Sequence, residues 1–294
     1  MTHFGTVTTA MVTPFSDDGA LAVDTAVALA RWLTDHGNDG LVVAGTTGEG
    51  PVLSDDERLE LWRAVAEAVS VPVVAGTGTN DTAHSVELTR RAAGTGVAGA
   101  LVVTPYYSRP SQAGLEAHFR AVAGASSLPV LLYDIPIRTG RKVSQDVLIR
   151  LAREVPNIVG VKDAALDVAA SAALMAAAPS GFELYSGNDD QTLPLLSIGA
   201  TGTVGIATHW AGELVGEMIA AFGKGDVERA RELNTRMLSS FAYETSDAAP
   251  NPLPTKAMLD VLGFPVGEAR LPMGPAPDGL AKAARTVAQD LGLL

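Results

Sequence analysis

The 294-residue sequence contains no cysteine, which excludes a disulfide-stabilised scaffold, a thiolate nucleophile, and zinc or iron–sulfur sites that need cysteine ligands. Aromatic residues are scarce, at 5% of the chain. Basic residues are also too few to balance the acidic ones, because 21 Lys and Arg oppose 33 Asp and Glu, for a formal net charge of −12. A protein with this charge is not expected to bind nucleic acid or an anionic membrane surface.

Long apolar segments are missing as well. No apolar run approaches the roughly 18 residues that a membrane span requires, and the first residues lack the basic-then-apolar order of a secretory signal. The 47% of hydrophobic residues are still enough for a sizeable core. We therefore expect a soluble, cytoplasmic globular protein. The five histidines show no paired spacing typical of metal ligands, so no metal site is predicted.

What the sequence does contain is a repeated order of a short Val-, Ile- and Leu-rich run, a turn and an amphipathic stretch. Eight runs are predicted to be strands: 8–14, 40–45, 71–76, 99–107, 129–135, 158–162, 182–186 and 203–206. Their apolar residues are nearly continuous rather than alternating, which is typical of parallel strands buried on both faces. Between them, Ser54 and Glu57 form a capping-box pattern, and Ser111 and Ser144 are further predicted helix N-caps.

Eight strands with intervening helices in about 210 residues predict a (β/α)8 TIM barrel. A doubly wound open sheet is the main alternative, but the glycine-rich dinucleotide fingerprint that it would normally carry after its first strand is absent. After about residue 208 only helical patterns remain, at 214–222, 227–241, 256–262 and 280–291, with proline-rich breaks at 250–254 and 272–277. We predict a catalytic barrel over residues 1–208 plus the helix that follows to about 224, and a C-terminal helical extension over residues 225–294.

Only one of the five lysines ends a predicted buried strand, and this is Lys162. The others lie in predicted turns or helices, where exposure to solvent is expected: Lys142, Lys224, Lys256 and Lys282. Burial of an ammonium group lowers its pKa, and a neutral lysine amine can form a Schiff base with a carbonyl compound. The alternative is a structural lysine paired with Asp163 or another inward carboxylate.

Other polar residues follow the strands at the end where a barrel carries its active site. Four of the five tyrosines fall there: Tyr106, Tyr107, Tyr133 and Tyr185. A phenol can relay a proton or stabilise an oxyanion, although cross-strand packing is the ordinary role of a strand tyrosine. The Gly-Thr-Thr-Gly turn with Thr46 and Thr47 could hold a small carboxylate or be simply a tight turn. Arg138, after the fifth strand, suits bidentate recognition of a carboxylate.

Taken together, these segments resemble the pyruvate-dependent class I lyases, the family that contains dihydrodipicolinate synthase and N-acetylneuraminate lyase. The resemblance covers almost the whole chain, in eight ordered motifs: TAMVTPF at 9–15, GTTGE at 45–49, AGTGTN at 75–80, VTPYY at 103–107, YDIP at 133–136, GVK at 160–162, YSGND at 185–189 and NPLPTK at 251–256. The order and spacing of the set are far more specific than any single motif.

The resemblance implies a role for each catalytic candidate. Lys162 would form an imine with pyruvate, so that no separate cofactor is needed. Tyr133 would transfer protons near the imine, in a relay with Thr46 and Tyr107. In the family the second tyrosine of the Tyr-Tyr pair crosses a tight-dimer interface, which implies a homotetramer built as a dimer of dimers.

The resemblance also implies the substrate contacts. Thr46 and Thr47 would hold the pyruvate carboxylate, while Gly187 and Val204 would contact the bound keto acid. Arg138 stands where the dihydrodipicolinate synthase branch binds the carboxylate of aspartate semialdehyde. This favours condensation of pyruvate with L-aspartate 4-semialdehyde to 4-hydroxy-tetrahydrodipicolinate, in lysine and diaminopimelate biosynthesis. The alternatives are an aldolase for a sialic or 2-keto-3-deoxy sugar acid, and a non-catalytic barrel that binds a keto acid.

One departure from the family concerns feedback inhibition by lysine. Family members that respond to lysine have an acidic residue that binds the amine of the effector, and His84 stands at that position. Asp55 and Arg58 replace two histidines of the same site. Because an imidazole does not substitute for a carboxylate as the partner of an ammonium, we predict weak or absent inhibition by lysine.

Overall fold

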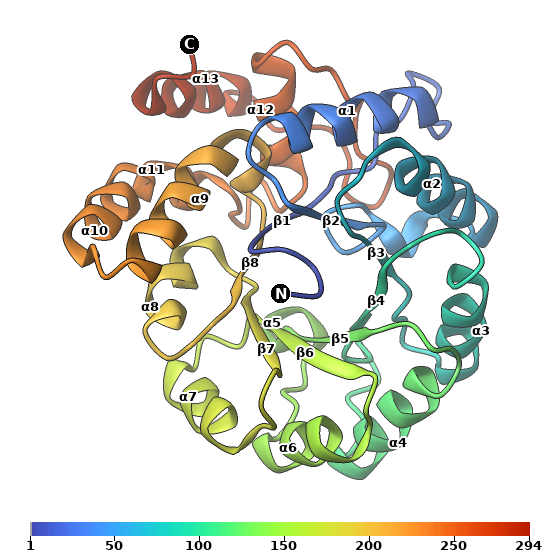
Figure 1. Ribbon diagram of the computed structural model, residues 1–294. Coiled ribbons are helices and arrows are strands. Elements are labelled where there is room, and N and C mark those ends of the chain that lie inside the picture. Colours follow the sequence, from blue (N-terminus) through green and yellow to red (C-terminus); the bar gives the residue numbers. More distant parts are fainter. Residues whose placement is uncertain (1) are drawn as a thin grey trace.

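Eight parallel strands form a closed barrel in the computed structural model, which describes residues 2–294. The strands follow one another around the barrel in chain order, with helices outside them (Figure 1). They are β1 (Val7–Ala10), β2 (Gly40–Val43), β3 (Val73–Gly76), β4 (Gly99–Val103), β5 (Val130–Asp134), β6 (Ile158–Asp163), β7 (Glu183–Ser186) and β8 (Gly202–Gly205). The predicted TIM barrel is confirmed, and each predicted strand overlaps an observed one.

Two strands end four residues earlier than the sequence pattern indicates. The predicted runs 8–14 and 99–107 extend beyond the last residues of β1 and β4. Each run contains a proline past that point, Pro14 or Pro105, and proline has no N–H with which to continue the ladder. The extra residues instead form the turns at the carboxyl end of the barrel.

Helices connect the strands, and two short 3₁₀ segments follow β2 and β7. They are α1 (Val23–Asp35), η1 (Gly50–Val52), α2 (Asp55–Ala68), α3 (Thr82–Ala92), α4 (Gln112–Ala123), α5 (Pro136–Thr139), α6 (Gln145–Glu154), α7 (Val168–Ala177), η2 (Asp189–Gln191), α8 (Thr192–Leu196) and α9 (Thr208–Gly223). The capping box of α2 is confirmed in both directions, since Glu57 N–H donates to Ser54 Oγ and Ser54 N–H donates to the Glu57 carboxylate. Ser111 caps α4 as predicted, whereas Ser144 stands at the N-cap of α6 without a side-chain hydrogen bond to it.

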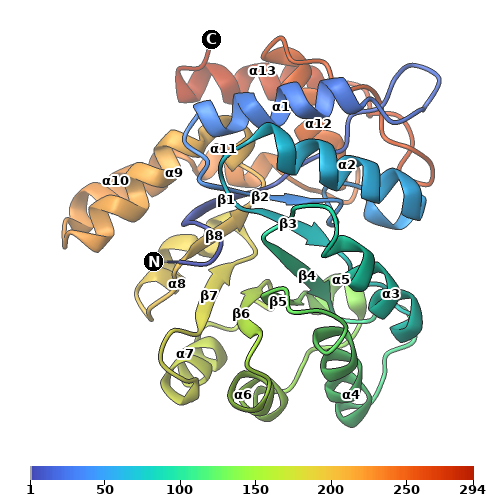
Figure 2. The same ribbon diagram turned by 45° about the vertical axis from the view of Figure 1, so that its right-hand side comes forward.

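The C-terminal extension is helical, as predicted, and packs beside α9 and α1 (Figures 1 and 2). It consists of α10 (Val227–Arg236), α11 (Leu238–Tyr243), α12 (Leu253–Val261) and α13 (Leu280–Leu291). The single helix predicted over 227–241 is wrong, because the chain breaks at the fully buried Met237. Helix α12 starts inside the predicted proline break, since proline fits the first turn of a helix, where its missing N–H would be unpaired anyway. The domain boundary near residue 224 stays a prediction.

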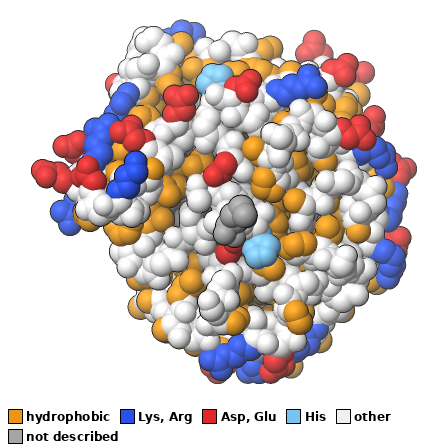
Figure 3. Space-filling model, viewed as in Figure 1, with side chains coloured by type: hydrophobic (Ala, Val, Ile, Leu, Met, Phe, Trp, Pro, Cys, Tyr) orange, Lys and Arg blue, Asp and Glu red, His pale blue; other side chains and the backbone are white. Residues whose placement is uncertain are grey.

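Successive side chains of each strand point alternately into the barrel and toward the helices, so the core has an inner and an outer layer. Leu131 and Tyr133 of β5 face the barrel interior, while Val130 and Leu132 face the surrounding helices. At the amino end of the barrel, the buried ring of Phe4 fills the interior. Figure 3 shows the face of the molecule seen in Figure 1, on which Lys and Arg side chains lie toward the edge, close to Asp and Glu side chains. No helix within residues 2–294 is both long enough and apolar enough to cross a membrane.

Candidate active site

A cavity of about 410 Å³ opens at the carboxyl end of the barrel. Its walls come from the turns after β2, β3, β4 and β5, and from residues 270–273 of the C-terminal extension. The predicted site residues among its lining are Thr46, Tyr107, Tyr133 and Arg138. This is the end at which TIM-barrel enzymes carry their active sites.

Lys162 lies on β6 inside the barrel, in register with Tyr133 on β5 and Tyr185 on β7. Lys162 is 4% exposed, and its Nζ lies 4.4 Å from the centroid of the Tyr133 ring. Burial lowers the pKa of Lys162 to about 8, with the negative charge of Asp189 opposing the shift and the positive charge of Arg138 adding to it. A much larger fraction of this amine is therefore neutral near pH 7 than is usual for a lysine.

The alternative structural role for Lys162 finds no support in the contacts. The Asp163 carboxylate accepts hydrogen bonds from Ala165 N–H and from the Ser171 hydroxyl. It therefore faces the surrounding helices rather than the barrel interior, where Lys162 lies. Within residues 2–294, Lys162 forms no ion pair with any carboxylate. An unpaired, buried amine with a lowered pKa is typical of a reactive lysine.

The ring of Tyr133 lies against this amine. Burial raises the pKa of Tyr133 to about 12, against the charge of Arg138 and a hydrogen bond with Thr46. The phenol is therefore protonated at neutral pH and can act as a proton donor. Tyr185 differs from it, because its hydroxyl donates to Glu183 Oε2, with Gly5 O as a second acceptor within reach, toward the amino end of the barrel and away from the cavity.

Tyr107 stands apart from the other members of the predicted relay. Its backbone has a left-handed φ of 72°, and its side chain is 90% exposed at the rim of the cavity. Within one chain the structure therefore brings Thr46 and Tyr133 together but leaves Tyr107 turned outward. Its participation in the relay remains a prediction that depends on a second subunit.

The turn that follows β2 is tight. Ala44 and Glu49 both have left-handed φ values, of 57° and 56°. A Cβ on Gly50 would lie 2.4 Å from Ala44 O, so only glycine fits at this position. Thr46 faces the cavity, whereas Thr47 is buried beside it and accepts a hydrogen bond from Asn251.

The two remaining predicted contacts lie in the barrel wall. A Cβ on Gly187 would come within 2.8 Å of Ala164 Cβ, and Gly187 N–H donates to Asp163 O. Val204 on β8 belongs to the same interior cluster as Tyr133. Neither residue lines the open cavity, and nor does Lys162; Tyr133 connects the cavity to this deeper layer.

Comparison with known proteins shows the family. Residues 3–290 match the profile of the dihydrodipicolinate synthetase family. The chain belongs to this family. A 4-hydroxy-tetrahydrodipicolinate synthase of Acidothermus cellulolyticus is 52% identical over 92% of this chain and 87% of that protein. That of Moorella thermoacetica is 46% identical over 99% of this chain and 100% of that protein.

Solved structures of the family have the same fold. Dihydrodipicolinate synthase from Cyanidioschyzon merolae, solved with lysine bound, superposes with a TM-score of 0.97 at 40% identity over the full length of both chains. A dihydrodipicolinate synthase variant described as monomeric superposes with a TM-score of 0.94 at 34% identity, over 99% of this chain and 98% of that one. The barrel with its helical extension is thus the fold of the dihydrodipicolinate synthetase family.

Two buried carboxyl groups near Lys162 were missed by the sequence analysis. Asp189 follows β7 and Glu244 follows α11, and both are almost fully buried. Burial raises the pKa of each, and the charge of Asp189 raises that of Glu244 further. The motif YSGND contains Asp189, but nothing in the sequence indicates that residue 244 lies beside it. Within residues 2–294, no group of three or more His, Asp or Glu side chains is arranged to hold a metal ion.

The expected exposure of Lys256 is wrong. This lysine of α12 is 6% exposed, and its Nζ lies 2.9 Å from Glu49 Oε1 in a buried ion pair. A lysine within a helical pattern is exposed by default, and only the tertiary fold brings Glu49 to it. Arg58 was missed as a cavity residue in the same way: it is buried, lines the cavity and donates to Gly50 O.

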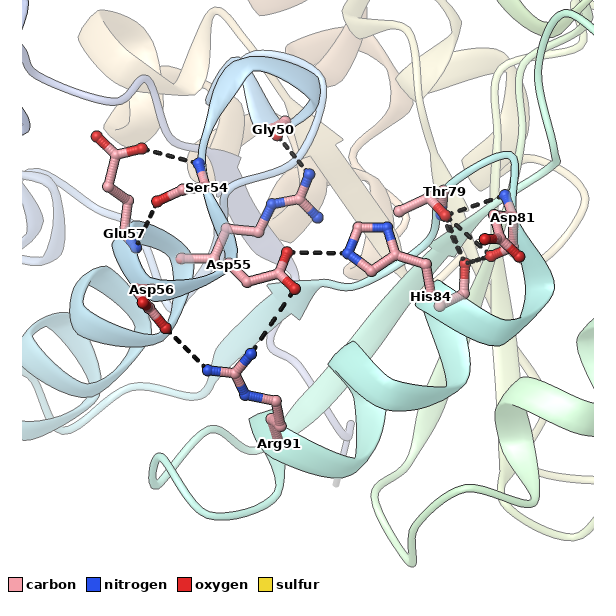
Figure 4. A network of polar contacts seen from close by, with 11 residues as sticks. Gly50, Ser54, Asp55, Asp56, Glu57, Thr79, Asp81, His84 and Arg91 are labelled. Carbon is pink, nitrogen blue, oxygen red and sulfur yellow. Dashed lines mark hydrogen bonds and ion pairs between the residues drawn. The ribbon is translucent and has the colours of Figure 1, made fainter.

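Two of the three residues that the resemblance assigns to the family's lysine site, Asp55 and His84, pair with each other. Asp55 at the start of α2 lies between His84 and Arg91 of α3 (Figure 4). Its carboxylate is 2.9 Å from His84 Nε2 and 3.7 Å from Arg91 Nη1. The position at which the resemblance implies an acidic residue in lysine-sensitive members therefore carries an imidazole that already has a partner.

Proposed function

We propose that this protein condenses pyruvate with L-aspartate 4-semialdehyde to form 4-hydroxy-tetrahydrodipicolinate, through a covalent imine on Lys162 and without a separate cofactor. The observation that carries the proposal is the buried, unpaired amine of Lys162 beside the phenol of Tyr133, in a barrel of the dihydrodipicolinate synthetase family. Relatives that carry this activity in their names match the chain over nearly its full length. The product supplies lysine and diaminopimelate biosynthesis.

The chemistry follows from the two side chains. The neutral amine of Lys162 adds to C2 of pyruvate, and the carbonyl oxygen leaves as water to give the imine. Loss of a proton from C3 gives an enamine, whose C3 attacks the aldehyde carbon of the second substrate. The amino group of that substrate then attacks C2, closes the ring and releases Lys162. Tyr133, hydrogen-bonded to Thr46, supplies and recovers protons in these steps.

Substrate contacts complete the proposal. Thr46 and Thr47 hold the pyruvate carboxylate at the turn after β2, and Gly187 and Val204 shape the wall of the barrel around the keto acid. Arg138, on the short helix α5, lines the cavity and offers a guanidinium to the carboxylate of the aldehyde. This arginine favours aspartate semialdehyde over the sugar acids of the related aldolases.

Reductive trapping tests the imine. Borohydride with pyruvate should convert the imine to a stable secondary amine, adding a pyruvate-derived mass to the wild type and to Lys282→Ala, an exposed-lysine control. The adduct should be absent in Lys162→Ala. An adduct that persists in Lys162→Ala overturns the assignment of the reactive lysine, and no adduct in the wild type favours the non-catalytic barrel.

A coupled assay tests the second substrate. Pyruvate, aspartate semialdehyde, the downstream reductase and NADPH should give steady nucleotide oxidation with the wild type. Arg138→Ala should lower the specificity constant for the aldehyde while pyruvate trapping stays intact. Trapping without turnover in the wild type would instead favour the sugar-acid aldolases. The homotetramer, with Tyr107 crossing a tight-dimer interface, and the cytoplasmic location belong to this proposal as predictions.

A further inference from the structure

The C-terminal extension contacts the turn at residues 45–50 from three positions. Asn251 Nδ2 donates to Thr47 Oγ1 at 3.0 Å. Lys256 Nζ forms its ion pair with Glu49 Oε1 at 2.9 Å, and Arg270 N–H donates to Glu49 Oε2 at 2.8 Å. The turn that precedes α2 is thus held by residues that lie at the other end of the chain.

The contact with Asn251 determines how the Thr47 hydroxyl is oriented. Asn251 Oδ1 accepts a hydrogen bond from Thr255 Oγ1 at 3.3 Å, which leaves the NH₂ group of the amide facing Thr47. A hydroxyl that accepts such a bond keeps its own proton for donation. Within residues 2–294 no group accepts that proton, although Thr47 is only 3% exposed. The hydroxyl is therefore ready to donate to a ligand that enters the barrel.

The contacts with Glu49 fix the backbone of the same turn. Glu49 has a left-handed φ of 56°, which costs free energy in a residue other than glycine, and both of its carboxylate oxygens are held by the extension. Lys256 also donates to Thr13 O at 2.9 Å. Thr13 Oγ1 in turn donates to Gly48 O at 2.6 Å, so the turn is tied on both sides.

We infer that Asn251, Lys256 and Glu49 are positioning residues for keto-acid binding: they fix the turn of Thr46 and Thr47 and leave the Thr47 proton free for the carboxylate of the substrate. The inference rests on the proposed function, because it takes pyruvate as the ligand of that turn. It assigns to the extension a part in substrate binding, although none of its three contacts touches the reacting atoms.

One isosteric and one truncating variant of Asn251 test the orientation of the Thr47 hydroxyl. In Asn251→Asp the new carboxylate accepts the Thr47 proton, so Thr47 no longer donates to pyruvate. The pyruvate concentration for half-maximal borohydride trapping should rise roughly 10–100-fold, the range for a lost hydrogen bond to a charged group. Asn251→Ala should have a smaller effect, because it leaves the proton free. Thermal unfolding of both variants separates the two roles, because a purely structural role predicts that the loss of pyruvate binding follows the loss of stability, and Asn251 is buried.

A double-mutant cycle with Thr47→Val shows whether Asn251 acts through Thr47. In the Thr47→Val background, Asn251→Asp should change the pyruvate dependence little further, since the hydroxyl is gone. An undiminished effect of Asn251→Asp in that background would overturn the inference and indicate direct repulsion of the substrate by the new charge.

The ion pair is tested with a variant that is expected to fold. Lys256→Met alone leaves the Glu49 carboxylate buried without its cation, which is strongly destabilising, whereas Lys256→Met with Glu49→Gln removes both charges. The double variant should recover thermal stability over the single one but still require more pyruvate for trapping, with Lys282→Met as an exposed control. Wild-type pyruvate dependence in both the double variant and Asn251→Asp overturns the inference. Absence of trapping in the wild type would overturn the proposed function instead.

Discussion

Opposing influences set the pKa of Lys162, and one of them can be removed without changing the shape of the site. Burial lowers this pKa to about 8, while the charge of Asp189 holds it up. Asp189→Asn removes that charge and can still accept the hydrogen bond that Asp189 Oδ2 receives from Ile206 N–H. Because the neutral amine is the nucleophile, trapping should become faster as pH rises through the pKa. We expect Asp189→Asn to move this rise to lower pH.

The measurement is the initial rate of pyruvate trapping at saturating pyruvate, over roughly pH 6 to 10, a range that spans the pKa of Lys162. Asp190→Asn is the matched control, because the neighbouring Asp190 is exposed. It should leave the pH profile in place. A profile of Asp189→Asn that coincides with the wild type, or moves to higher pH, would show that Asp189 does not set the pKa of Lys162.

Asp134, next to Tyr133, gives a prediction about stability. Its side chain is 2% exposed, and burial raises the pKa of its carboxyl to about 6, against the charge of Lys142 3.5 Å away. A folded-state pKa above the usual value of 3.8 means that the native state binds the proton more tightly, so stability falls as pH rises from about 4 to about 6. Above that window, ionisation of buried Asp134 lowers the free energy of unfolding by on the order of 2–3 kcal/mol.

Asp134→Asn removes this cost, and its side-chain oxygen can keep the hydrogen bond from Val143 N–H. The free energy of unfolding in urea should therefore be higher than that of the wild type at pH 8, by about 1–3 kcal/mol. At pH 4.5 the difference should be smaller, because the wild-type carboxyl is largely protonated there. An equal difference at both pH values would show that the gain does not come from titration of Asp134.

Individual residues differ in how far the sequence alone could place them. Lys162 was predictable because a lysine within a buried apolar run conflicts with its surroundings, and such a conflict is typical of a functional site. Lys256 was not, because its burial depends on Glu49, a partner more than 200 positions away. The same holds for Asp189 and Glu244, which only the tertiary fold brings together.

At the scale of elements, the strands and most helices were predictable from local patterns. Near-continuous Val, Ile and Leu runs mark the eight strands, and the capping box of Ser54 and Glu57 marks the start of α2. The break between α10 and α11 was not predictable, because the apolar period runs through Met237 and the residue is buried against neighbouring helices. Tertiary packing, rather than helix propensity, decides such a break.

The contact between α2 and α3 yields a prediction about regulation. A lysine effector would need a free carboxylate for its side-chain ammonium, but Asp55 is already engaged with His84 and Arg91. We expect submillimolar lysine to leave turnover in the coupled assay essentially unchanged, whereas strong inhibition in that range would contradict the prediction. Arginine, which also carries a cationic side chain, serves as the control for nonspecific effects.

At the scale of the whole molecule, the extension is integrated with the barrel more closely than its sequence indicates. Side chains of α9, α10, α12 and α13 share one apolar cluster. The ion pair of Lys256 with Glu49 and the hydrogen bond of Asn251 with Thr47 connect the same segment to the cavity. Composition and periodicity predicted the helices, but they carry no information on these long-range contacts.

Tyr107 gives the last prediction, which concerns assembly. Its side chain is 90% exposed, and Ile137 nearby on α5 is 83% exposed, so two large apolar groups face outward at the carboxyl end of the barrel. If Tyr107 completes the site of a neighbouring subunit, Lys162→Ala and Tyr107→Ala should complement each other. In a mixed dimer, the Tyr107→Ala subunit keeps its own lysine and receives a tyrosine from its partner.

Each variant alone should have little turnover, measured in the coupled assay. After equimolar mixing under conditions that exchange subunits, turnover should rise to about a quarter of the wild-type value, because half of randomly formed dimers are mixed and one site in each is complete. Light scattering should show that both variants form the same oligomer as the wild type. Turnover equal to the average of the two separate variants, in a sample shown to have exchanged, would place Tyr107 in the site of its own chain or outside the relay.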